Sequence, residues 1–187
     1  MMRIIAGEFR GRRLIAPKGK GTRPTTDRVR ESLFNWLEHH PDIELRGAHI
    51  GDFFAGTGAL GIEALSRGAA FVTFFETDRA AFEALKQNIT NLGVESRCQV
   101  LRCDATRMPK AKQTCDIVFL DPPYGKNLEE KTLQRARAQG WLKPNAVIVL
   151  ESQSKDIAQF ETIGFKSTEN RVYGNSRISL LHPLIEN

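Results

Sequence analysis

The sequence DFFAGTGALG, residues 52–61, is the first indication of the fold of this chain. Its glycines at positions 56, 58 and 61 satisfy the pattern G-x-G-x-x-G, and an apolar run precedes them. Such a pattern between a strand and a helix allows a tight turn and a close approach of the backbone to a ligand at the helix N-terminus. The stretch predicts the first strand-to-helix turn of a nucleotide-binding α/β domain, and it suits NAD as well as other adenosine cofactors.

Strand-like and helix-like segments alternate after this turn. Helices are expected over 58–68 and 78–93, the second with Asp78 as N-cap and Gly93 at its end. Apolar strands are expected over 49–55, 71–76, 98–103, 115–121 and 146–152, and a closing antiparallel hairpin over 171–181. Continuous apolar strands separated by helices indicate a parallel sheet covered on both faces. The sequence thus predicts a mostly parallel seven-stranded α/β sheet with an antiparallel C-terminal hairpin.

The length of 187 residues fits one compact domain with a small appendage. We place a basic N-terminal hairpin or extension at residues 1–24 and the main domain at 25–187, with a helix starting at Thr25 or Thr26. The sequence has no run of about 18 apolar residues that could cross a bilayer. Its N-terminus lacks the apolar stretch of a secretion signal. We therefore expect a cytoplasmic protein.

The three cysteines and four histidines do not form a recognisable metal-ligand pattern. Cys98, Cys103 and Cys115 are odd in number and have no C-x-x-C spacing. This spacing argues against both a disulfide framework and a zinc site. We expect no metal cofactor.

Positive charge is concentrated at the N-terminus. The chain has a net charge of +5, but residues 1–30 hold nine basic and two acidic residues, a net +7, so the rest sums to −2. Such a cluster neutralises phosphates and indicates a nucleic-acid partner. The segment 3–16 reads as a small hairpin that presents arginines outward. The expected RNA-binding residues are Arg10, Arg12, Arg13, Lys18, Lys20 and Arg23.

Polar residues follow the second and third predicted strands. In doubly wound sheets, ligands bind at the carboxyl ends of the strands. Glu76 lies 20 positions after Gly56 and is placed to accept hydrogen bonds from ribose hydroxyls. Asp104 and Ala105 suit an adenine edge, with the carboxylate accepting from the exocyclic amine and the backbone N–H donating to the ring. Together these residues predict an adenosine pocket.

The fourth strand ends in Asp121-Pro122-Pro123-Tyr124. The prolines fix φ, so the carboxylate and the preceding carbonyls are held as acceptors. The tyrosine offers a stacking face worth about 1–3 kcal/mol per base. Two acceptors beside a stacking face fit a planar base whose exocyclic NH2 group donates two hydrogen bonds.

An aromatic amine is a poor nucleophile, because its lone pair is delocalised into the ring. Hydrogen bonds from its N–H groups to fixed acceptors draw the lone pair toward the attacking direction. The expected electrophile is the methyl group of S-adenosylmethionine, held in line by the glycine loop. The methylated amine is very acidic, so a carboxylate at Asp121 with an ordinary pKa, near 4, suffices.

Four segments together resemble the bacterial 16S ribosomal RNA guanine-N2 methyltransferases of the RsmD type. They are GEFRGRRL (7–14), GTRPTTDRVRESLFNWL (21–37), DFFAGTGALGIEALSRGA (52–69) and VFLDPPY (118–124). The resemblance covers nearly the whole chain. It implies a class I methyltransferase fold, with S-adenosylmethionine as methyl donor and the N2 amine of a guanine in small-subunit rRNA as acceptor.

The resemblance also implies roles for individual residues. The segment that contains Thr25, Thr26 and Arg28 would lie over the cofactor. The methionine part of the cofactor would be held by Asp52, Ala55, Gly56, Thr57 and Gly58, the ribose by Glu76, and the adenine by Asp104 and Ala105. Asp121, Pro122, Pro123 and Tyr124 would grip the guanine, with Asp121 also next to the cofactor. The expected partner is 16S rRNA in an assembling or assembled small subunit, bound by a monomer.

Three other functions remain open at this point. An adenine-N6 methyltransferase of DNA or RNA shares the DPPY motif, so the base is identified by the resemblance and not by the chemistry. An NAD-dependent oxidoreductase would need an acid–base pair and a substrate domain that the sequence does not offer. A non-catalytic RNA-binding assembly factor is the third function, and the intact Asp121 argues against it.

Overall fold

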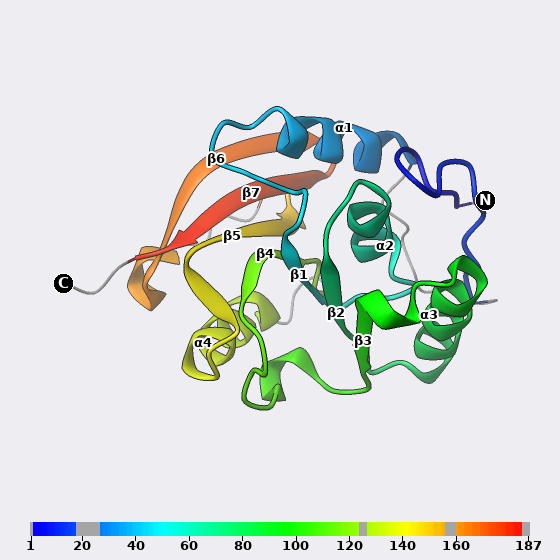
Figure 1. The fold of residues 1–187 in the computed structure, drawn as a ribbon. Coiled ribbons are helices and arrows are strands. Elements are labelled where there is room, and N and C mark those ends of the chain that lie inside the picture. Colours follow the sequence, from blue (N-terminus) through cyan, green and yellow to red (C-terminus); the bar gives the residue numbers. More distant parts are fainter. Residues whose placement is uncertain (1, 18–26, 124–126, 156–159, 185–187) are drawn as a thin grey trace.

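The computed structural model describes residues 2–17, 27–123, 127–155 and 160–184. Its centre is a seven-stranded sheet with the order β3-β2-β1-β4-β5-β7-β6 (Figure 1). Strands β1 to β5 are parallel, and β7 pairs antiparallel with β5 and β6. The strands are β1 (His49–Phe53), β2 (Phe71–Phe75), β3 (Cys98–Leu101), β4 (Cys115–Leu120), β5 (Leu142–Gln153), β6 (Phe165–Tyr173) and β7 (Ser176–Pro183). The predicted mostly parallel seven-stranded sheet is confirmed.

Helices cover both faces of the sheet. Helices α1, α2 and α3 contribute to one core cluster, and α4 contributes to the other. The helices are α1 (Asp27–Glu38), α2 (Ala59–Ser66), α3 (Arg79–Leu92) and α4 (Leu128–Ala138), with 3-10 turns η1 (Glu95–Arg97), η2 (Ala105–Arg107) and η3 (Phe160–Ile163). Asp78 caps α3 by accepting from the N–H of Ala81, and Gly93 ends it in the left-handed conformation. Both helix boundaries match the sequence prediction.

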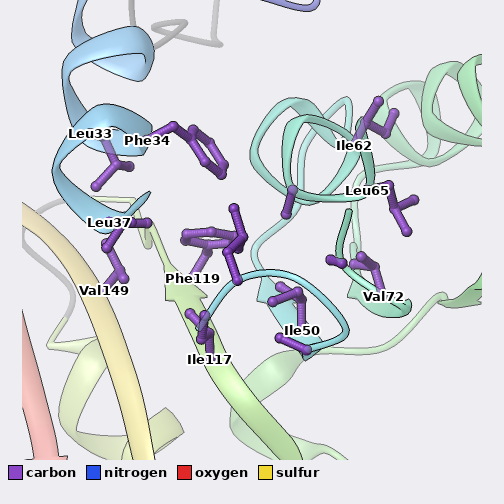
Figure 2. Packing of buried hydrophobic residues seen from close by; sticks show 14 of the residues in the cluster. Leu33, Phe34, Leu37, Ile50, Ile62, Leu65, Val72, Ile117, Phe119 and Val149 are labelled. Carbon is purple, nitrogen blue, oxygen red and sulfur yellow. The ribbon is translucent and has the colours of Figure 1, made fainter. Parts of the chain in front are cut away.

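Apolar residues at helical spacing attach α1 to the sheet. Leu33, Phe34 and Leu37 are buried and lie above Phe119 of β4 and Val149 of β5 (Figure 2). The rings of Phe34 and Phe119 are 5.6 Å apart between centroids. Such burial contributes about 1.5–3 kcal/mol per large side chain. The apolar stripe of α1 therefore fixes the helix across the centre of the sheet.

Several predicted strand boundaries are wrong: β1 ends at Phe53 and not at residue 55, β5 begins at Leu142 and not at residue 146, and β3 and β6 also differ. β3 ends at Leu101 and not at residue 103, because the N–H of Cys103 turns back to the carbonyl of Leu101 at 2.9 Å. β6 begins at Phe165, whereas the sequence suggested a strand from residue 171. Six consecutive residues of β6 are polar, so the strand lacks the apolar pattern from which strands were predicted. Pairing with β7 holds this exposed edge strand in place.

The N-terminal segment is a narrow hairpin packed on the domain. Within residues 2–17, one antiparallel bridge joins Arg3 to Arg13, and the N–H of Ile4 donates to the carbonyl of Arg12 at 2.9 Å. Ile4 and Leu14 are buried in the core cluster of α1 to α3. The predicted domain division near residue 24 falls outside the described residues and stays a prediction.

A buried ion-pair network holds this hairpin against α1 and α2. The carboxylate of Glu63, with no exposed surface, accepts from the backbone N–H groups of Ile5 at 2.8 Å and Ala6 at 3.0 Å. It also accepts from the Nε of Arg67 at 2.8 Å and lies 3.9 Å from the Nε of the buried Arg30. Arg67 also forms an ion pair with Glu38, with 2.8 Å between its Nη1 and the Oε2 of Glu38. Arg30 in turn pairs with Asp27 at 3.0 Å, so the two buried arginines share Glu63 and each has one further, more exposed carboxylate.

Candidate active site

The strand order reverses between β1 and β4, and the acidic residues of the chain's motifs gather there. Phe53 pairs with Leu120, and Leu120 pairs with Leu150, so the carboxyl ends of β1 and β4 lie level with Leu150 of β5. Asp121 therefore follows β4 directly beside Glu151 of β5. Ligands of open α/β sheets bind in the crevice at such a reversal.

Register places these acids on one face of the sheet. Asp52 pairs with Phe119, and Phe119 pairs with Val149. Paired side chains share a face, and side chains two residues apart along a strand also do. Asp52 and Glu151 therefore lie on the face that α1, α2 and α3 cover.

Carboxylates of β1 and β2 hold the glycine-rich turn. Asp52 is buried, and its Oδ2 accepts from the N–H of Gly61 at 2.9 Å. Glu76 accepts from Gly56 N–H at 2.7 Å and from Asp78 N–H at 2.6 Å. A carboxylate has about four lone-pair sites, so Glu76 retains acceptor capacity for a further donor. The turn is thereby fixed before any ligand binds.

A buried amide ties the same turn to the N-terminal hairpin. Asn88 of α3 donates to the carbonyl of Thr57 at 3.1 Å and to the carbonyl of Ile15 at 3.0 Å. Its Oδ1 accepts from the N–H of Ile15 at 2.7 Å. The basic hairpin and the glycine turn consequently share one polar side chain.

The remaining predicted site residues fall into three groups. Asp104 accepts from the N–H and hydroxyl of Thr106, both at 2.8 Å, and starts η2 beyond β3, with Ala105 buried. Pro122 is buried and Pro123 is exposed after β4, while Arg28 is exposed in the first turn of α1. Thr25, Thr26, Tyr124, Lys18, Lys20 and Arg23 lie outside the described residues.

Two of the clustered carboxylates, Asp52 and Asp121, have raised pKa values. Burial raises the pKa of Asp52 to about 7, against the Gly61 hydrogen bond and with a contribution from Glu76. Burial, together with the charges of Glu151 and Asp52, raises the pKa of Asp121 to about 8. The mechanism expected from the sequence requires no more than an ordinary pKa at Asp121, and burial together with the neighbouring acids raises the pKa above that value. Such a site favours a cationic ligand, which would stabilise the ionised carboxylates.

We expect the raised pKa of Asp52 to make folding stability fall as pH rises. In the folded state Asp52 keeps its proton up to about pH 7, whereas the ordinary pKa of an aspartate is 3.8. The protonated Asp52 therefore contributes its full stabilisation below pH 3.8, and this stabilisation is lost as the pH rises from 3.8 through about 7. Asp52→Asn keeps an acceptor for Gly61 but cannot titrate. The urea midpoint of Asp52→Asn minus that of the wild type should therefore be larger at pH 8.5 than at pH 5. A constant difference would contradict the raised pKa.

The sequence reasoning missed Glu151 and Asn88. Glu151 directly follows the apolar run 146–150, at the same edge of the sheet as the DPPY motif. An acidic residue at the end of a predicted strand could have identified it from the sequence. Asn88 gave no signal, because a lone polar residue in an amphipathic helix is ordinarily exposed.

The described residues offer neither a group of metal ligands nor a membrane-spanning helix. Among them, no three histidine, cysteine or acidic side chains are grouped in a way that could hold a metal ion. No helix in the described part of the chain is long and apolar enough to span a membrane.

Comparison with known proteins identifies the family. A model of the family described as conserved hypothetical protein 95 matches residues 2–182. The chain belongs to this family. It is the RsmD family that the sequence motifs resemble, so that prediction is confirmed.

Relatives in the RsmD family carry methyltransferase names. The ribosomal RNA small subunit methyltransferase D of Escherichia coli K12 is 46% identical over 153 residues, covering 81% of this chain and 75% of that protein. The putative rRNA methyltransferase YlbH of Bacillus subtilis is 36% identical over 184 residues, covering 96% and 97%. A solved structure of the putative methyltransferase yhhF from Escherichia coli superposes with a TM-score of 0.85, 37% identity and 99% coverage of both chains. The predicted α/β methyltransferase fold is confirmed.

Proposed function

We propose that this RsmD-family protein transfers the methyl group of S-adenosylmethionine to the exocyclic N2 amine of a guanine in 16S rRNA. The observation that carries the proposal is the group of carboxylates at the strand reversal, with Asp121 at its centre beside the glycine turn. The names of the relatives support rRNA as the substrate. We place the reaction in the cytoplasm, with a monomer acting on rRNA in an assembling or assembled small subunit.

The residues present fit S-adenosylmethionine. Its sulfonium and ammonium groups supply the positive charge that the acids with raised pKa values favour, and its methyl group supplies the electrophile. Gly56 has a φ of +55°, and a Cβ built on it would meet no atom of the described residues within 4 Å, so this part of the structure leaves open space for a ligand. We assign the methionine part to the turn from Asp52 to Gly58, the ribose to Glu76, and the adenine to Asp104 and Ala105.

The protein's own groups would then prepare the guanine. A cation beside Asp121 favours the ionised carboxylate, so binding of the cofactor converts this side chain into an acceptor for the N2 hydrogens. Pro122 and Pro123 limit the conformations of the backbone that carries it. After methyl transfer, the N2 cation loses a proton, and Asp121 is the nearest assigned acceptor.

The two glycine positions should respond differently to alanine. In Gly61→Ala the Cβ would lie 2.4 Å from Cε1 of Phe74, so we expect a loss of about 1–3 kcal/mol of stability. In Gly56→Ala the Cβ meets no atom of the described residues, so we expect a smaller loss, about 1–2 kcal/mol from the positive φ, but a weaker affinity for S-adenosylmethionine. Urea unfolding and calorimetric titration of both variants measure these effects. Undiminished affinity in Gly56→Ala would place the ligand elsewhere.

The N-terminal hairpin is our proposed RNA-binding element. Arg10, Arg12 and Arg13 are exposed on it, and Arg12 also donates to the carbonyl of Asn91 at 2.6 Å. Lys18, Lys20 and Arg23 belong to the same proposal from the sequence. Because Ile4 and Leu14 anchor the hairpin, its arginines are presented from a fixed base.

Reversal of Arg10, Arg12 and Arg13 to glutamate should weaken RNA binding and flatten its salt dependence. Each lost phosphate contact reduces the slope of log K against log salt by about 0.7–0.9. The measurement is a binding titration at several salt concentrations. Lys166→Glu, on the opposite edge strand β6, is the matched control. A slope equal to that of the wild type would show that the hairpin does not contact phosphate.

One experiment tests the proposed reaction directly. The protein is incubated with labelled S-adenosylmethionine and, in separate reactions, with small ribosomal subunits, naked rRNA or duplex DNA, and the nucleosides are identified after digestion. N2-methylguanosine in rRNA is the expected product. N6-methyladenine, or cofactor binding without transfer to any substrate, would overturn the substrate assignment.

A further inference from the structure

Glu151 occupies a fixed position next to the predicted catalytic carboxylate. It lies within β5, which pairs with β4 on one side, through Leu150 and Leu120, and with β7 on the other, through Glu151 and Ile178. The backbone of Glu151 is thus held in the interior of the sheet, whereas Asp121 stands just beyond the end of its strand. A side chain on such a strand is a more precise positioning element than one on a loop.

The order of the strands separates two sides of the site. The glycine turn and Glu76 follow β1 and β2, while Asp121 and Glu151 belong to β4 and β5. Glu151 therefore lies on the side of Asp121 that is remote from the proposed cofactor side. Its carboxylate is nevertheless close enough to Asp121 for its charge to act on that group. We therefore take this side for the base, because the residues assigned to the cofactor lie on the other side of Asp121.

Two adjacent carboxylates repel each other, and burial increases this unfavourable interaction. A substrate that donates several hydrogen bonds in a row would offset it. The Watson–Crick edge of guanine presents N1–H beside the N2 amine, and both groups are donors. Adenine presents its amine beside N1, which is an acceptor and is not complementary to an ionised carboxylate.

We propose that Glu151 reads the N1–H of the target guanine while Asp121 holds its N2 amine. This inference rests on the proposed guanine-N2 function and adds a specificity-determining residue to it. The sequence motifs alone left guanine and adenine unresolved, because the DPPY motif serves both amines. Glu151 would supply the discrimination, since its ionised carboxylate accepts from guanine and has no hydrogen to donate to N1 of adenine.

The base 2-aminopurine provides a direct test, because it keeps the N2 amine but has an acceptor at N1. The target guanine is first located with the wild-type protein and then replaced by 2-aminopurine in the same RNA. We expect the wild type to prefer guanine by roughly 10- to 100-fold in kcat/KM, as for a good bidentate base contact. In Glu151→Gln the amide can donate to N1, so this preference should fall to within a few-fold.

The controls separate the possible failures. Glu130→Gln, an exposed change on α4, should leave the preference unchanged, and calorimetry should find the affinity of Glu151→Gln for S-adenosylmethionine close to that of the wild type. Where Glu151→Gln is too slow to assay, competitive binding of the two RNAs gives the same ratio. If the preference for guanine persists in Glu151→Gln, or is absent from the wild type, the proposed role of Glu151 is wrong, but the proposed function is not affected. A wild type that makes no N2-methylguanosine overturns the proposed function itself.

Discussion

Asp121→Ala is expected to lower kcat for methyl transfer by at least about 10²–10³-fold while the protein still binds S-adenosylmethionine. The carboxylate lies at the strand reversal next to Glu151 and Asp52, and in our proposal it accepts hydrogen bonds from the attacking amine. The cofactor is assigned mainly to the glycine turn and Glu76, which the substitution does not touch. The loss should therefore fall on the chemical step.

Single-turnover rates and calorimetric titration of the cofactor measure the two effects separately. Asp121→Asn is the matched control, because it keeps one acceptor oxygen without the charge. We expect its rate to lie between those of the wild type and Asp121→Ala. Loss of cofactor binding together with activity in Asp121→Ala would show that this division of roles is wrong.

Glu63→Gln should lower the free energy of unfolding by about 3–5 kcal/mol. The buried carboxylate is shared by Arg30, Arg67 and the backbone of Ile5 and Ala6, so neutralising it removes the one fully buried counter-charge of both arginines and leaves them only the more exposed Asp27 and Glu38. Domains of this kind have a total stability of about 5–15 kcal/mol. The expected loss is thus a large fraction of the total, and it should loosen the N-terminal hairpin first.

Urea unfolding gives the free energy for Glu63→Gln and for its control, Glu38→Gln. Glu38 pairs with the same Arg67 at 2.8 Å, but its side chain is 36% exposed. Partly exposed pairs contribute up to about 1 kcal/mol, so the control should lose no more than that. Equal and small losses in both variants would mean that the buried arginines find other partners.

Local patterns explain how much of the fold could be predicted from the sequence. Asp78 and Gly93 bounded α3 correctly, because a capping side chain and a left-handed glycine act within one helical turn. The exposed strand β6 was predicted only in its last part, because its polar residues carry no apolar alternation and its pairing with β7 holds it in place. Prediction succeeded where the interactions that form an element are local.

The fold class, the family and the motif residues of the candidate site could be predicted from the sequence. Pro122 and Pro123 fix φ and Gly56 permits a positive φ wherever these residues occur, and strand–helix alternation brings strand ends to one edge. The raised pKa of Asp121, the place of Glu151 beside it and the anchoring of the hairpin became visible in the three-dimensional structure. These features depend on contacts between residues far apart in the chain, such as Ile5 and Glu63, which are separated by 58 positions. Burial and charge act through space, and a linear pattern records neither.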